Sequence, residues 1–155
     1  MFLILDEWVI HDLQNNNGKE KQRETFLFLK KIEERKFDKL VIVKNSKFTK
    51  KLYKFLRISD SEVEFKIKAR FLVRSLIQDF KKTEFIELAI LINEKQINNK
   101  VLSNVNVDDH YLVLAYFYFK TKEDTIIITT DKKLKETLEQ NEIFIKFRDE
   151  FLSNY

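Results

Sequence analysis

The chain has 155 residues but no cysteine, no proline, one glycine and two histidines, and these scarcities exclude several classes of protein. Without cysteine it has no disulfide, no thiolate nucleophile and no cysteine-ligated zinc or iron–sulfur site. A single glycine, Gly18, excludes the P-loop and the glycine-rich dinucleotide fingerprint, and His11 with His110 cannot form the zinc-protease helix motif. Any catalytic metal would therefore have oxygen ligands, which favours Mg²⁺ or Mn²⁺.

The composition is that of a folded domain, because hydrophobic residues make up 44% of the chain and 15 of them are phenylalanine. The length fits a single domain over residues 1–155. No apolar run approaches the roughly 20 residues that span a bilayer, and no secretory signal opens the chain. We therefore expect a cytoplasmic protein without a membrane segment. The net charge of +4 permits nucleic-acid binding without requiring it.

Short apolar runs rich in β-branched residues predict buried strands of a parallel sheet at residues 2–5, 40–43 and 125–129. A further strand is expected at 143–147, and segment 85–92 is ambiguous between strand and helix. Strands that alternate with helices indicate an α/β fold, a three-layer α/β/α sandwich around a central parallel sheet. The helices are expected at residues 8–13, 19–36, after 46, 61–81, 108–120 and 132–139.

Local signals mark several of these boundaries. Residues 15–18, Asn-Asn-Asn-Gly, are typical of a loop. Ser46 is a candidate N-cap for the helix after the second strand. Ser61, with Glu64 three residues later, forms a candidate capping box for the next helix.

Aspartates stand directly after two of the predicted strands. Asp6 follows the first strand, Asp131 follows the strand at 125–129, and Asp108 with Asp109 opens an apolar helix. Ligands of open α/β sheets bind outside the carboxyl ends of the strands, so these side chains predict an anionic pocket for a divalent cation. Taken singly, each aspartate is equally well explained as a helix cap, a turn residue or a complement to the helix dipole.

The order of three segments resembles the PIN domain, a family of Mg²⁺- or Mn²⁺-dependent nucleases related in fold to flap endonucleases. These segments are Leu-Ile-Leu-Asp at 3–6, Asp-Asp-His-Tyr-Leu-Val-Leu-Ala at 108–115, and Thr-Ile-Ile-Ile-Thr-Thr-Asp-Lys-Lys-Leu at 125–134. The resemblance implies that Asp6, Asp108 and Asp131 are catalytic metal ligands, with Asp109 as a further ligand or as the ligand in place of Asp108. Thr129 would support them by a hydrogen bond.

A PIN-like protein would be a metal-dependent ribonuclease or nuclease, and many family members are toxins of toxin–antitoxin pairs. The implied partners are RNA or DNA and an antitoxin or other protein. A homodimer is also expected, because PIN-like domains commonly dimerise and because segment 111–119 holds more aromatic residues than one helix can expose. The lysines expected to hold the phosphate backbone are Lys44, Lys47, Lys132 and Lys133.

The chain departs from the family pattern at two places. Glu7 follows Asp6 where a small polar residue is usual, and residues 45–52 carry lysines where the family places a glutamate. This leaves a catalytically degenerate PIN-like module, binding RNA or a protein, as an alternative. A phosphoryl-transfer protein of the receiver or phosphatase type is a third reading, although its motif of paired acids and a later lysine is poorly met. The acids that would replace the missing ligand are Glu7, Asp12, Glu84 and Glu87.

Overall fold

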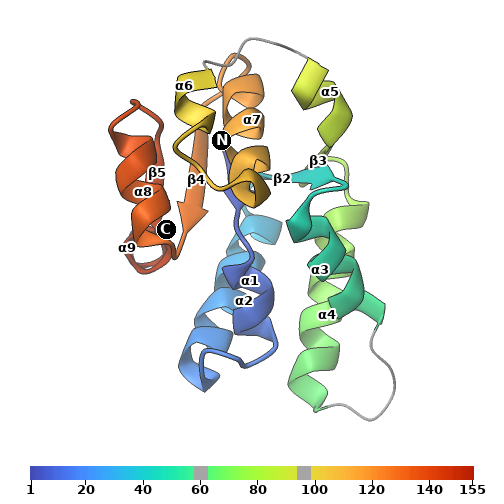
Figure 1. Ribbon diagram of the computed structural model, residues 1–155. Helices are drawn as coiled ribbons and strands as arrows, with labels where there is room; N and C mark the ends of the chain where they lie inside the picture. Colours follow the sequence, from blue (N-terminus) through green and yellow to red (C-terminus); the bar gives the residue numbers. More distant parts are fainter. Residues whose placement is uncertain (58–62, 94–98) are drawn as a thin grey trace.

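The computed structural model describes residues 1–57, 63–93 and 99–155 and contains one parallel β-sheet (Figure 1). Its strand order is β3-β2-β1-β4-β5, and each neighbouring pair runs parallel. The α/β sandwich predicted from the sequence is therefore confirmed. The strands are β1 (Phe2–Leu5), β2 (Lys39–Lys44), β3 (Thr83–Glu87), β4 (Thr125–Thr129) and β5 (Ile145–Phe147).

Helices cover the sheet in two groups, with α5, α6 and α7 together at the top of the view and α1 to α4 at the bottom (Figure 1). The last helix, α9, joins the second group, since Phe28 of α2 packs edge-on against Phe151 of α9. No helix in the described ranges has the length and apolar character needed to cross a bilayer. The helices are α1 (Trp8–Leu13), α2 (Lys19–Glu34), α3 (Lys47–Arg57), α4 (Glu64–Gln78), α5 (Leu88–Asn93), α6 (Asn99–Leu102), α7 (His110–Phe119), α8 (Lys132–Glu139) and α9 (Arg148–Asn154), with a 3₁₀ turn, η1 (Val107–Asp109).

The three central strands form the core. Every residue of β1 and β4 is buried, as are residues 40–43 of β2, so the prediction of central, parallel, buried strands is confirmed. Such uniform burial is expected where helices cover both faces of a parallel sheet.

The aromatic helix α7 lies inside this arrangement. Six consecutive residues from Tyr111 to Tyr116 are buried, and α7 contacts β1, β2, β4 and α5. The chain itself therefore covers the side chains that suggested a dimer surface. Self-association remains a prediction, and α7 does not require it.

Several boundaries differ from the sequence-based expectation. Segment 85–92 divides into the end of β3 and most of α5. The last strand begins at Ile145 instead of residue 143. The Ile143 N–H donates to the Leu138 carbonyl and the Phe144 N–H to the hydroxyl of Tyr116, so neither N–H donates to β4, although the Phe144 carbonyl accepts the Ile127 N–H. The Ser46 cap is present, since its Oγ accepts the Thr49 N–H at 3.2 Å, whereas Ser61 lies outside the described residues.

A buried ion pair that the sequence analysis did not anticipate joins the ends of the chain. Arg148 Nε donates to Asp12 Oδ2 at 2.7 Å, and the two side chains are only 2% and 1% exposed. The Thr25 hydroxyl donates to the same carboxylate oxygen at 2.7 Å. Asp12, α2 and the start of α9 are thus fixed together by a fully desolvated charge pair.

Removal of the cation should strongly destabilise the fold. Arg148→Met leaves the Asp12 carboxylate buried without its cation, and such unpaired charges typically cost about 3–5 kcal/mol. Urea denaturation of the wild type and of Arg148→Met measures the difference in the free energy of unfolding. Lys146→Ala is the matched control two residues away, because it removes a partly exposed contact with Glu150 at 3.8 Å and a contact with the exposed ring of Phe144. Equal denaturation midpoints for Arg148→Met and Lys146→Ala would contradict this account.

Candidate acidic site at the carboxyl edge of the sheet

The strand order reverses between β1 and β4. The chain passes from β1 to β2 on one side, and β4 later pairs with the other side of β1. Open α/β sheets form their ligand-binding crevice at such a point, outside the carboxyl ends of the strands. Asp6 follows β1 directly and Asp131 lies two residues beyond β4, so both stand at this crevice.

Thr129 links the two strand ends. Its hydroxyl donates to Asp6 Oδ2 at 2.9 Å, and its oxygen accepts the Asp131 N–H at 3.0 Å. The other carboxylate oxygen of Asp6 accepts the Glu7 N–H at 2.6 Å. Both oxygens of Asp6 are therefore oriented, and the fully buried Thr129 side chain is the group that orients one of them.

Asp131 also has a structural role. Its Oδ1 accepts the Leu134 N–H at 2.9 Å and caps α8, as the sequence also allowed. The side chain is exposed, and its charge contributes to the raised pKa of Asp109. Asp131 therefore caps its helix and faces the acidic site as well.

The 3₁₀ turn before α7 separates the two adjacent aspartates. Asn106 caps this turn by accepting the Asp108 N–H at 3.1 Å. Asp109 is half-buried and interacts electrostatically with Asp6 and Asp131, whereas Asp108 is exposed and lines a neighbouring cavity. Of the two adjacent aspartates, Asp109 is thus the one that is half-buried and interacts with the other carboxylates.

The pKa values of Asp6 and Asp109 are both raised, chiefly by burial. Burial raises the pKa of Asp6, and the charge of Glu7 adds to the effect while hydrogen bonds and Lys47 oppose it. Burial also raises the pKa of Asp109, with Asp6 as the strongest charged contributor. We call Asp6, Asp109 and Asp131 the acidic cluster. The charge of Lys47 opposes the rise in pKa at both Asp6 and Asp109.

Four acids were candidates for the ligand that is missing from the family pattern, and of these Glu7 lies beside the acidic cluster. Its Oε2 contacts Lys51 at 2.8 Å and Lys47 at 3.4 Å, both on α3, the helix where the family resemblance expects an acid. Its Oε1 is buried and has no hydrogen-bond partner within the described ranges. The other three acids pair elsewhere: Asp12 with Arg148, Glu84 with Lys39 and Glu87 with Lys44.

The four lysines expected at phosphates differ in their surroundings. Lys44 pairs with Glu87 at 3.3 Å on the side of β3, and Lys47 pairs with Glu7 within the site. Lys132 makes a long contact with Glu136 at 3.7 Å, and Lys133 is exposed. The two lysines of α8 are therefore the more accessible to a phosphate near Asp131.

The chemistry of these donors fits a hard divalent cation, because carboxylate oxygens are the ligands that Mg²⁺ and Mn²⁺ prefer. Their spacing is less favourable. Within the described part of the chain, no three His, Cys, Asp or Glu side chains lie close enough together to hold one ion. Binding would require the carboxylates of the acidic cluster to move toward one another.

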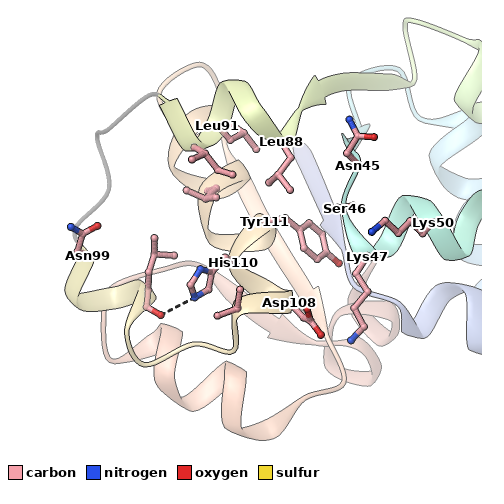
Figure 2. A pocket seen from close by; sticks show the side chains of 14 residues that line it. Asn45, Ser46, Lys47, Lys50, Leu88, Leu91, Asn99, Asp108, His110 and Tyr111 are labelled. Atoms are coloured by element: carbon pink, nitrogen blue, oxygen red, sulfur yellow. Dashed lines mark hydrogen bonds between the residues drawn. The ribbon is translucent and has the colours of Figure 1, made fainter.

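A cavity of about 860 Å³ adjoins the acidic cluster, with walls formed by α3, α5 and the start of α7 (Figure 2). Lys47 and Asp108 stand at one end of it and interact electrostatically. Tyr111 lies on its wall, and the pKa of its hydroxyl is raised well above the usual range by burial and by the charges of Asp6, Glu7 and Asp109. The tyrosine therefore lies between the cavity and the acidic cluster.

The raised pKa of Asp109 predicts a pH-dependent stability. A carboxyl with a pKa above its ordinary 3.8 binds protons more tightly in the folded state, so folding loses stability as pH rises through that folded pKa. Asp109→Asn should therefore raise the melting temperature at pH 7 in EDTA, and the gain should vanish below about pH 4. Asp108→Asn, at the exposed neighbour, should produce a smaller change. A lower melting temperature of Asp109→Asn at pH 7 would refute this assignment.

Comparisons of this chain with protein-family models, with curated proteins and with solved structures find no match. The resemblance to PIN domains therefore rests on the three sequence segments and remains a prediction.

Proposed function

We propose that this protein is a Mg²⁺- or Mn²⁺-dependent nuclease that hydrolyses phosphodiester bonds of RNA at the acidic cluster. The observation that carries the proposal is that Thr129 joins Asp6 to the backbone of Asp131 at the reversal of strand order, with Asp109 within electrostatic reach of both carboxylates. Such a crevice is where α/β proteins place their ligands. The negative charge of its carboxylates favours a cation over any anionic ligand in direct contact.

The residues of the site have different proposed roles, which follow from their surroundings. Asp6 and Asp109 would hold the ion, with Asp131 completing the set, and Thr129 keeps Asp6 oriented through its hydrogen bond. A bound divalent ion lowers the pKa of water and neutralises charge on the phosphate. Two carboxylates about 4 Å apart repel by roughly 4 kcal/mol at an effective dielectric constant near 20, so an ion would stabilise the converged arrangement.

A second candidate function is a non-catalytic module that binds RNA or a protein. The contact of Lys47 with Glu7 supports it, because lysine ammonium groups already neutralise part of the charge that a metal ion would balance. The two candidates differ in metal binding. A nuclease should gain thermal stability on addition of Mn²⁺ and lose that gain in Asp6→Asn, whereas the module should respond to neither.

Asp6→Asn should lower the rate of RNA cleavage by a hundredfold or more, or about 2.7 kcal/mol in the barrier, because it removes one ligand charge and preserves the side-chain shape. The measurement is cleavage of fluorescently labelled single-stranded RNA in Mn²⁺ or Mg²⁺, with EDTA as the negative condition. Asp109→Asn should cause a comparable loss, and Asp108→Asn should retain most of the activity.

This set of variants also decides between the two functions. If wild type cleaves neither RNA nor DNA with either metal, and Asp6→Asn changes neither stability nor binding in Mn²⁺, the nuclease proposal fails and the binding module replaces it.

Lys132→Ala should weaken RNA binding modestly and reduce the slope of log affinity against log salt by about 1, because a phosphate contact contributes through counterion release. Fluorescence anisotropy at several salt concentrations measures both quantities. Lys68→Ala on α4 is a matched control, since each lysine makes an exposed contact with a glutamate four residues away. The same salt slope for Lys132→Ala and Lys68→Ala would remove Lys132 from the RNA-binding surface.

A further inference from the structure

We infer that the cavity beside the acidic cluster receives one unpaired nucleotide of a single-stranded RNA whose backbone follows the exposed face of α3. This inference rests on the proposed function and specifies its substrate as single-stranded. It is carried by the lining of the cavity, which includes the ring of Tyr111, and by a row of cations that begins at its rim.

The cavity combines apolar walls with a few polar groups, as binding pockets for small molecules do. Leu88 and Leu91 of α5 and Leu114 of α7 form apolar wall (Figure 2). Its volume of about 860 Å³ lies within the range of ligand pockets, roughly 300–1,000 Å³. A base has a flat apolar face and polar edges, and therefore fits such a lining.

Tyr111 contributes an aromatic ring to the wall of the cavity, and the residue is only 4% exposed. Its hydroxyl is buried and close to the charges of Asp6, Glu7 and Asp109, so the ring is the part of this side chain that a ligand in the cavity would contact. Aromatic rings are surfaces on which bases stack. The nearby His110 is different, because its Nε2 already lies 3.0 Å from the carbonyl oxygens of Leu102 and Val105.

Positive charges extend from the rim of this cavity along α3. Lys47, Lys50, Lys54 and Arg57 follow at helical spacing and are all exposed, while the buried side of α3 packs into the core. Lys47 contacts Glu7, whereas the other three make no ion pair within the described part of the chain. A row of cations beside a pocket for a base is the arrangement by which proteins hold single strands.

A single strand fits this surface better than a duplex. A paired base must leave its stack before it can enter a cavity, which costs free energy that an unpaired base does not pay. The carboxylate of Asp108 on the cavity wall is an acceptor suited to an amino group on a base edge and would repel a phosphate. The phosphates are therefore assigned to the lysines of α3.

The test measures binding in EDTA, so that it does not depend on metal or cleavage. Adenosine, guanosine, cytidine and uridine 5′-monophosphates are titrated by calorimetry, and a labelled single-stranded RNA by fluorescence anisotropy. Leu88→Trp fills the cavity and should weaken nucleotide binding at least tenfold. Ile90→Trp is the matched control on the same helix, because Ile90 is 46% exposed and does not line the cavity, and it should leave binding unchanged.

A further variant keeps the test decisive if Leu88→Trp fails to fold. Lys50→Glu should weaken single-stranded RNA binding at least fivefold, whereas Lys68→Glu on α4 should cause no more than a small general loss. No nucleotide binding by wild type, or equal effects of each variant and its control, would overturn the inference even if the protein cleaves RNA in Mn²⁺. Nucleotide binding with this variant pattern but without cleavage would support the pocket and reject the nuclease.

Discussion

The parallel pairing of β1 with β4 is the constraint on which the candidate site depends. Leu5 lies opposite Ile128, so the residues that follow each strand emerge at the same level of the sheet. The indole N–H of Trp8 donates to the Ile128 carbonyl at 2.9 Å and fixes the chain just after Asp6. Because strand side chains alternate between faces, a slip of one residue would separate Asp6 from Thr129 and remove their hydrogen bond.

The buried and partly buried acids of this protein have two different kinds of surroundings. Asp12 is enclosed and fully paired with Arg148, an arrangement that serves the fold. Asp6 and Asp109 are partly buried near other acids, and this burial raises the pKa of both carboxyls. Binding sites often retain such destabilising groups because their function needs them, and the acidic cluster has this character.

Helix α3 connects the acidic cluster to the neighbouring cavity. Its buried residues, including Phe48 and Phe55, anchor it in the core, which positions the lysines on its other side. Lys51 and Lys47 neutralise Glu7 beside Asp6, and Lys47 also lines the cavity. The absence of an acid on α3 is thus the feature that most separates this site from the pattern it resembles, and it gives the same helix a positively charged exposed face.

The sequence by itself determined most elements of this fold, because apolar runs, helical periodicity and turn residues act over a few neighbouring positions. It left segment 85–92 ambiguous and did not predict α6 or α9. It also determined that Asp6 and Asp131 would follow buried strands. Tertiary structure alone decided that Asp109 faces the acidic cluster, since the 3₁₀ turn before α7 sets which of two adjacent side chains points inward. It likewise selected Glu7 from four candidate acids and paired Asp12 with Arg148 across the length of the chain. Such choices depend on which segments the strand order brings together, and local sequence patterns carry no information about those distant partners.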